Sequence, residues 1–168
     1  MRVAIVGNSG SGKTTLAGRL IECERAAVLD LDTVAWEPDR IAVARPVELA
    51  CADVRAFCMA HESWIIEGCY AGLIEAGLEF NPDLLVLDPG LDRCVSNCLA
   101  RPFEPHKYSS KEEQDEKLSF LLEWVEEYYS RDGDMSLAAH KRLFELYSGP
   151  KKWLSELPQS GFTVDKLN

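Results

Sequence analysis

The sequence predicts an α/β fold in which a parallel sheet lies between two layers of helices. Short, almost wholly apolar runs alternate along the chain with segments whose apolar residues recur at helical spacing. Such runs are typical of strands that are buried on both faces, because helices cover both faces of a parallel sheet. The length of 168 residues suits one domain with a well-buried core. We therefore expect residues 1–168 to form a single domain.

Each expected strand is a short run of this kind, and the first four are followed by, or end at, a glycine or an aspartate. In chain order the strands are expected at residues 2–6, 26–30, 63–67, 84–87 and 142–147. Ligands of open parallel sheets sit at the carboxyl ends of the strands. The polar residues at those ends are therefore the candidates for chemistry.

Each expected helix either shows apolar residues at helical spacing or begins at a residue that favours a helix start. The helices are expected at about 13–23, 46–61, 72–77, 91–100 and 111–130, with shorter ones opening at Ser136 and at Pro150. Both Pro46 and Pro150 suit the first turn of a helix. The long helix 111–130 has one apolar face, and its acidic opposite face reads as a solvated surface.

The segment after the first expected strand has the pattern of a phosphate-binding loop, G-x-x-x-x-G-K-[S/T]. A strand precedes it and a helix follows it, in the order that a nucleoside triphosphate site needs. The residues that fit the pattern are Gly7, Asn8, Ser9, Gly10, Ser11, Gly12, Lys13 and Thr14. Glycines let the backbone pass close to phosphate oxygens, and successive N–H groups then form an anion nest at the helix N-terminus.

Two side chains of this loop have expected roles of their own. Lys13 should reach the β- and γ-phosphates of ATP, and the Thr14 hydroxyl should bind Mg²⁺. Thr15 either touches the α-phosphate or is an ordinary threonine of the first helical turn.

Composition and charge exclude two classes of partner. The net charge of −10 argues against a nucleic-acid binder and against an anionic membrane surface, since both need clustered Lys and Arg. No apolar run approaches 18 residues, so no membrane span is expected. The N-terminus has no signal peptide pattern. Six cysteines without a C-x-x-C pair read as buried reduced thiols, which suggests a cytoplasmic protein.

Four acidic residues at or just after expected strands are candidates for metal binding or proton transfer: Asp30, Asp32, Glu67 and Asp88. Mg²⁺ takes oxygen ligands and keeps several waters, so Thr14 and one or two carboxylates suffice. We favour Glu67 as an outer-sphere ligand, with Asp30 and Asp88 as contenders. Asp32 is the candidate for binding the acceptor or taking its hydroxyl proton, or it is a loop or cap aspartate.

Four segments give the chain a resemblance to the adenylate kinase-like P-loop kinases. It most resembles the small topology-modulation, or adenylate kinase-related, proteins. The segments are the phosphate loop, residues 31–36 (L-D-T-V-A-W), residues 64–70 (W-I-I-E-G-C-Y), and Leu87-Asp88-Pro89 followed by a helix that ends in Arg101. Shikimate- and gluconate-type kinases are similar too, and Asp30-Leu31-Asp32 resembles the Asp-x-Asp of the shikimate enzymes.

The resemblance implies a three-layer P-loop NTPase fold with a five-stranded parallel sheet of order 2-3-1-4-5. It also implies an acceptor-binding region at about residues 31–62 and a lid at about 101–110. Arg101 matches a lid arginine that stabilises the transferring phosphoryl group, and Arg131 would be a second. Residues Ser148, Gly149 and Pro150, after the fifth expected strand, would lie against the nucleotide base.

The function implied is ATP-dependent, Mg²⁺-assisted phosphoryl transfer to a small nucleoside, nucleotide or metabolite. Adenylate kinases carry an arginine after strand 3 that grips the acceptor's phosphate, but residues 68–71 here (G-C-Y-A) have none. Arg40 or Arg45 is the candidate to replace that charge. The alternative is an ATPase or nucleotide-responsive regulator without a small acceptor. A GTPase is disfavoured because the sequence lacks N-K-x-D.

Overall fold

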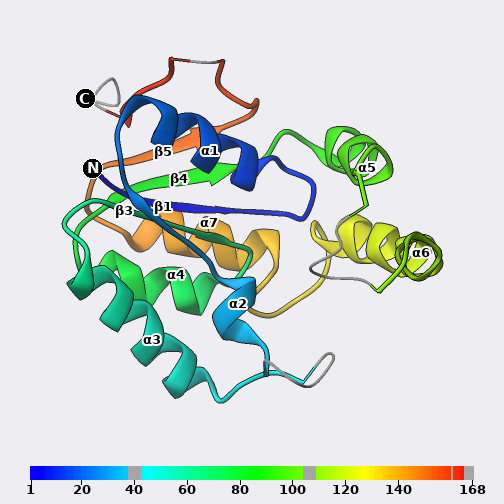
Figure 1. Ribbon diagram of the computed structural model, residues 1–168, viewed down its shortest axis with the longest axis horizontal. Helices are drawn as coiled ribbons and strands as arrows, with labels where there is room; N and C mark the ends of the chain where they lie inside the picture. Colours follow the sequence, from blue (N-terminus) through cyan, green and yellow to red (C-terminus); the bar gives the residue numbers. More distant parts are fainter. Residues whose placement is uncertain (38–42, 104–108, 160, 165–168) are drawn as a thin grey trace.

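The computed structural model describes residues 1–37, 43–103, 109–159 and 161–164. Five parallel strands form one sheet in the order β2-β3-β1-β4-β5 (Figure 1). The strands are β1 (Arg2–Gly7), β2 (Ala27–Asp30), β3 (Trp64–Gly68), β4 (Asp83–Leu87) and β5 (Lys151–Leu154). The predicted α/β class, strand order and parallel pairing are confirmed.

Helices cover both faces of the sheet, so the fold has three layers. On one face the sheet packs against α3 (Val47–Ala60), α4 (Ala71–Leu78) and α7 (Leu137–Leu146). On the other it packs against α1 (Lys13–Cys23) and the C-terminal segment. The central strand β1 explains this arrangement, because its alternate side chains enter the two opposite cores and residues 3–6 are fully buried.

Two helices stand apart from these layers. α5 (Leu91–Leu99) and α6 (Lys111–Glu127) project beyond the carboxyl ends of the strands (Figure 1). They pack on each other through a small core of their own, formed by Cys94, Cys98 and Val125. A ligand at the carboxyl edge of the sheet would therefore lie beside this helix pair.

The predicted elements after residue 135 are wrong in two places. Residues expected as a strand at 142–147 belong to α7, and the helix expected from Pro150 is β5. Helical spacing continues through α7, where His140 and Leu143 are buried, and the Ser136 hydroxyl accepts a hydrogen bond from the backbone N–H of Ala139. Pro150 is tolerated because it directly precedes an edge strand, which pairs with β4 alone.

Smaller departures concern the loop after β2 and the cysteines. Residues 32–35, expected as a loop, form the one-turn helix α2 (Asp32–Ala35). All six cysteines are free thiols, but Cys23 is exposed, and Cys51 and Cys69 are half-buried. Among the described helices, none has the length and apolar character needed to cross a membrane. Arg40 and residues 104–108 of the expected lid, which include His106 and Lys107, lie outside the described residues.

A buried histidine links three elements near the carboxyl edge. His140 on α7 contacts the Tyr128 hydroxyl through Nδ1 at 2.8 Å and the Cys69 carbonyl oxygen through Nε2 at 2.9 Å. A carbonyl can only accept, so Nε2 carries the proton and Nδ1 accepts from Tyr128. This neutral form uses both ring nitrogens, and burial penalises the charged form. Burial accordingly lowers the pKa of His140 from 6.5 to about 4.

His140 should make the protein less stable in acid. The unfolded chain takes up this proton near pH 6.5, whereas the folded chain resists it until about pH 4. The contribution is complete above pH 6.5 and is lost as the pH falls towards 4. Across that window it should reduce the free energy of unfolding by about 1.4 kcal/mol per pH unit.

Urea denaturation from pH 7 to pH 4 measures this effect as the difference between the wild type and His140→Gln. In His140→Gln the free energy of unfolding should lack this additional dependence on pH. The control His61→Gln, at the end of α3, should keep it. Parallel stability curves for the wild type and His140→Gln would contradict the assignment.

Candidate functional site

The loop between β1 and α1 adopts a conformation that depends on its glycines. Gly10 and Gly12 have positive φ angles of 75° and 98°, which L-residues with a side chain rarely adopt. A Cβ atom on Gly10 would lie 2.3 Å from the Cys94 carbonyl oxygen, and one on Gly7 would lie 2.3 Å from the Leu87 carbonyl oxygen. The loop thus passes directly against α5 and the end of β4.

Side chains from outside the loop hold it in this position. The Asn97 amide on α5 donates to the Gly10 carbonyl oxygen at 2.7 Å. The Asn8 amide, fully buried, donates to the Val125 carbonyl oxygen of α6 at 2.9 Å. Asn8 therefore binds the helix pair through its side chain, while Lys13 donates to the Asn8 carbonyl oxygen at 2.9 Å. The α5–α6 pair is a structural support of the loop.

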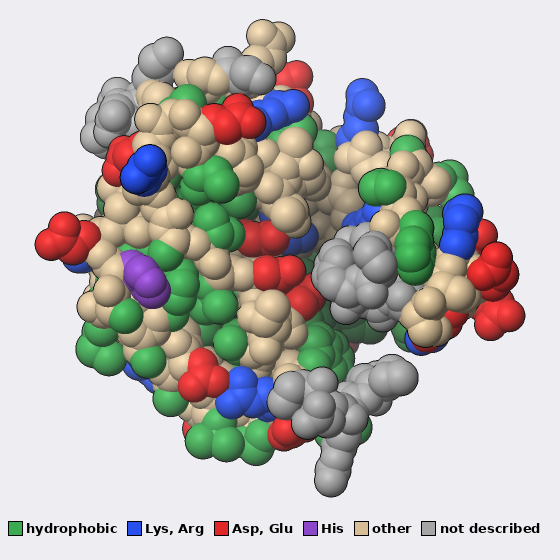
Figure 2. All heavy atoms as spheres, in the orientation of Figure 1, with side chains coloured by type: hydrophobic (Ala, Val, Ile, Leu, Met, Phe, Trp, Pro, Cys, Tyr) green, Lys and Arg blue, Asp and Glu red, His purple; other side chains and the backbone are tan. Residues whose placement is uncertain are grey.

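A cavity of about 560 Å³ opens at this loop and at the carboxyl ends of β2 and β3. It brings together most of the residues that the sequence singled out. From the phosphate loop it is lined by Ser9, Gly10, Gly12, Lys13, Thr14 and Thr15, and from elsewhere by Asp30, Asp32, Glu67 and Arg101. Acidic side chains also gather on the body of the molecule where it faces the projecting helix pair (Figure 2).

Thr14 and Glu67 are in direct contact in this cavity. The Thr14 hydroxyl donates to Glu67 Oε1 at 2.6 Å, and Glu67 is only 3% exposed. Burial raises the pKa of Glu67, and the nearby charge of Lys13 and the hydrogen bond from Thr14 partly offset that rise. A cation beside Glu67 would favour its ionised form further.

The oxygens in the cavity fit Mg²⁺. Asp30 pairs with Glu67 in the β2–β3 register, so the two carboxylates end neighbouring strands, and both line the cavity with Thr14. Among the described residues no group of three or more His, Cys, Asp or Glu side chains forms a metal cluster. Mg²⁺ does not need one, because it keeps waters and phosphate oxygens as ligands.

Asp32, the first residue of α2, lines the cavity. Its backbone N–H donates to Asp30 Oδ1 at 2.9 Å, and its Oδ1 accepts from the Tyr70 hydroxyl at 2.7 Å. Trp36, at the end of α2, packs against the core and donates from Nε1 to the same hydroxyl at 2.7 Å.

Other predicted residues lie elsewhere. Ser148, Gly149 and Pro150 precede β5, at the opposite end of that strand from the phosphate loop, because the strand expected before them is a helix. The Arg131 guanidinium donates to the carbonyl oxygens of Trp124 and Met135 and stacks on the Trp124 ring at 3.7 Å. Asp88 Oδ1 accepts from the Tyr129 hydroxyl at 2.7 Å. The cavity is lined by none of the five predicted residues in question, Ser148, Gly149, Pro150, Arg131 and Asp88.

Several residues that line it had no role predicted from the sequence, among them Asn97 and Leu157. Asn97 stands four positions before Arg101, a spacing that places both on one side of α5 and its end. Leu157 follows β5 and lies 3.4 Å from a Cβ built on Gly12. Placing the fifth strand correctly would have brought Leu157 to the carboxyl edge.

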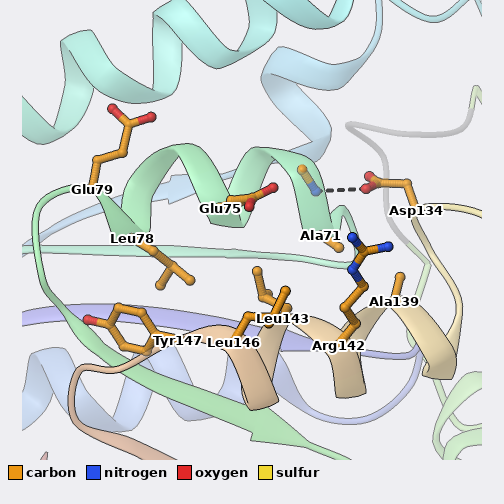
Figure 3. Close-up of a pocket in the computed structure, with 11 residues that line it drawn as sticks. Ala71, Glu75, Leu78, Glu79, Asp134, Ala139, Arg142, Leu143, Leu146 and Tyr147 are labelled. Carbon is orange, nitrogen blue, oxygen red and sulfur yellow. Dashed lines mark hydrogen bonds between the residues drawn. The ribbon is translucent and has the colours of Figure 1, made fainter.

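A second cavity, of about 460 Å³, lies between α4 and α7 (Figure 3). Its wall contains Leu78, Leu143 and Leu146 together with the charged Glu75 and Arg142. It shares no lining residue with the cavity at the phosphate loop. The predicted site residues that line a cavity therefore line the one at the phosphate loop.

Solved structures resemble the chain over nearly its whole length. A sugar kinase from a Janibacter species is 16% identical, with a TM-score of 0.51, and the match covers 99% of this chain and 88% of that one. A gluconokinase from Sinorhizobium meliloti is 14% identical, with a TM-score of 0.52, and covers 99% and 86%. The chain has the P-loop kinase fold. No family model and no curated protein matches its sequence.

At these sequence identities, the similarity to the solved structures shows the fold alone. The finer resemblance to the topology-modulation proteins stays a prediction, as do the roles of the individual cavity residues.

Replacing Gly10 by Ala should damage both the loop and the fold. The new Cβ would meet the backbone of α5 at a positive φ angle, so we expect the free energy of unfolding to fall by at least about 2 kcal/mol. Gly18→Ala is the matched control. No atom lies within 4 Å of a Cβ there, inside α1, and this change should raise stability by about 0.5–1 kcal/mol.

Urea denaturation of both variants measures the difference, and fluorescent-nucleotide titration reports on the loop. A Gly10→Ala protein as stable as the wild type would contradict the close approach of the loop to α5.

Proposed function

We propose that this protein is a kinase that transfers the γ-phosphoryl group of ATP to a hydroxyl of a small molecule, with the help of Mg²⁺. One observation carries the proposal. The cavity at the phosphate loop joins Lys13 and Thr14, at the start of α1, to Asp30, Asp32 and Arg101. The groups that we propose bind phosphate, bind the metal and accept the proton therefore line the same cavity.

The phosphate loop would hold the triphosphate of ATP. Its turn between β1 and α1 places backbone N–H groups and the positive end of the α1 dipole beside the cavity. The Lys13 ammonium donates to the Asn8 carbonyl oxygen in this structure. With ATP bound, it would donate to the β- and γ-phosphate oxygens instead. Charge neutralisation and positioning are the main needs of phosphoryl transfer, and both come from these groups.

Thr14, Glu67 and Asp30 would hold Mg²⁺, which would supply charge neutralisation at the phosphates. The Thr14 hydroxyl can bind through its lone pairs while it donates to Glu67, so the hydrogen bond of 2.6 Å is compatible with this role. Glu67 would act from the outer sphere, by orienting Thr14 and metal-bound water.

Asp32 would accept the proton of the acceptor hydroxyl. As the bond between the acceptor oxygen and the γ-phosphorus forms, the bond from that phosphorus to the β–γ bridging oxygen breaks and ADP leaves with its electron pair. Arg101, on the α5 side of the cavity, would stabilise the charge on the transferring group. Arg131 remains a candidate for a second such role, although its described contacts are to backbone carbonyls.

The neighbours in structure favour a hydroxyl as the acceptor. They are a sugar kinase and a gluconokinase, which support a proposal of this class of acceptor. Arg45, a predicted substitute for the missing phosphate-gripping arginine, is paired with Asp53 at 2.8 Å. We therefore rank sugars and other small alcohols before nucleoside monophosphates.

ADP formation from Mg·ATP tests the proposal, with a panel of sugars, sugar acids, nucleosides and nucleoside monophosphates. One acceptor should raise turnover several-fold, and Lys13→Ala should reduce it by at least about 100-fold. Asp32→Asn should lower kcat by a similar factor, because it removes the base and keeps the side chain's shape.

The alternative is an ATPase or nucleotide-responsive regulator. ATP binding with slow hydrolysis that no member of the panel increases would argue against the kinase and for this alternative. Equal activity of Lys13→Ala and the wild type would reject phosphoryl transfer at this cavity altogether.

Glu67→Gln should weaken the response to magnesium. Loss of an outer-sphere carboxylate typically lowers metal affinity by about 10- to 100-fold, so the Mg²⁺ concentration for half-maximal activity should rise by that range. Glu75→Gln, on α4 and outside the cavity, is the control. Magnesium titration at saturating ATP measures the shift, and equal midpoints for the three proteins would remove Glu67 from the metal site.

A further inference from the structure

The Tyr70 hydroxyl joins two residues of the segment after β2, although Tyr70 itself does not line the cavity at the phosphate loop. It accepts a hydrogen bond from Trp36 Nε1 and donates one to Asp32 Oδ1, both at 2.7 Å. The rings of Trp36 and Tyr70 also pack edge to face, with centroids 6.4 Å apart and planes at 71°. Tyr70 is only 8% exposed, so water has little access to replace these bonds.

Both ends of α2 meet at this single hydroxyl. Asp32 is the first residue of the helix and Trp36 is its C-cap. A helix of one turn has almost no stability of its own, because its few hydrogen bonds do not offset the free-energy cost of helix nucleation. The hydroxyl therefore clamps a helix that would otherwise fray, and the residue it holds at the near end is the proposed base.

The direction of the protons in this chain is fixed. An indole N–H can only donate, so the Tyr70 oxygen must accept from Trp36 and direct its own proton to Asp32. Burial, with the charge of Asp32 second, raises the pKa of Tyr70 well above its usual range, so the phenol keeps that proton. The Tyr70 hydroxyl thereby holds Asp32 Oδ1, on a residue that lines the cavity.

The backbone on each side of Tyr70 is itself held in place. The Cys69 carbonyl oxygen accepts from His140 at 2.9 Å. The Gly72 N–H donates to Asp134 Oδ1 at 2.7 Å, a bond visible at the start of α4 in Figure 3. The buried His140 and the exposed Asp134, from the α6–α7 region, thus fix the segment that carries the hydroxyl.

We propose that Tyr70 is a positioning residue of the acceptor site, which clamps α2 and orients the Asp32 carboxylate towards the acceptor hydroxyl. The proposal rests on the kinase function proposed above, and Tyr70 itself transfers no proton to substrate. Trp36 acts through Tyr70 by fixing the direction of the phenolic O–H.

The first experiment needs no substrate. Amide hydrogen exchange by NMR follows the α2 backbone, where the Ala35 N–H donates to the Leu31 carbonyl oxygen at 2.9 Å. In Tyr70→Phe this amide should exchange at least about five-fold faster, as expected for the loss of one net hydrogen bond. Tyr147→Phe is the control, since it removes a tyrosine hydrogen bond to the Pro82 carbonyl near the other end of the sheet.

The same spectra contain the indole N–H resonance of Trp36, identified by its loss in Trp36→Phe. It should move in Tyr70→Phe and stay in place in Tyr147→Phe. Unchanged exchange of the α2 amides and an unchanged indole resonance would overturn the clamp, whatever the enzyme's activity.

The second experiment measures steady-state kinetics with the acceptor that gives the highest turnover in the panel. Tyr70→Phe should lower acceptor-dependent kcat by about ten-fold or more, the scale of a hydrogen bond to a charged group, with little change in the KM for ATP. Trp36→Phe should have a smaller effect. The double variant should be no worse than Tyr70→Phe, because Trp36 acts only through the tyrosine.

The outcomes separate this proposal from the kinase proposal. Additive losses in the double variant, or a loss confined to the KM for ATP, would reject the positioning role while leaving the kinase intact. If no acceptor stimulates turnover, the kinase proposal fails, and with it the acceptor role of Tyr70, while the exchange data still decide whether the clamp exists.

Discussion

The backbone of Gly10 lies against the backbone of α5, closer than any side chain would allow. This contact fixes the phosphate loop between the sheet and the α5–α6 pair, and hydrogen bonds from Asn8 and Asn97 hold it from both helices. The positions of Lys13 and Thr14 follow from it, because α1 begins directly after the loop. A nest of N–H groups binds anions well only when its geometry exists beforehand, so rigidity here serves function.

Hydrogen bonds also organise the segment after β2 that carries Asp32, the proposed base. Buried polar side chains, each with its partners satisfied, fix a short segment after β3, and that segment in turn fixes the loop after β2 through Tyr70. A missing partner in such a network lowers the stability of the protein, whereas a network with every partner present favours a single conformation. The cavity is therefore lined both by the glycine-rich loop and by Asp32, whose carboxylate is held by the Tyr70 hydroxyl.

The sequence was a good guide where strong local signals agreed. Periodicity, a glycine-rich loop and a helix start pointed to the same structure for the first half of the chain. It failed around Pro150, because a proline can begin either a helix or an edge strand and only tertiary pairing with β4 decides between them. Contacts made across the fold, such as the one from Tyr70 to Asp32, 38 residues apart, leave no periodic pattern to read.

The carboxylates around the phosphate loop would also affect how fast the proposed nucleotide binds. Asp30, Asp32 and Glu67 share the cavity with Lys13 and Arg101, in a chain of net charge −10. A polyanion approaching this mouth is repelled at long range, although the loop attracts it at contact. Salt screens the distant repulsion more than the contact attraction. Association of ATP should therefore become faster as ionic strength rises, the reverse of the electrostatic steering that most anion sites use.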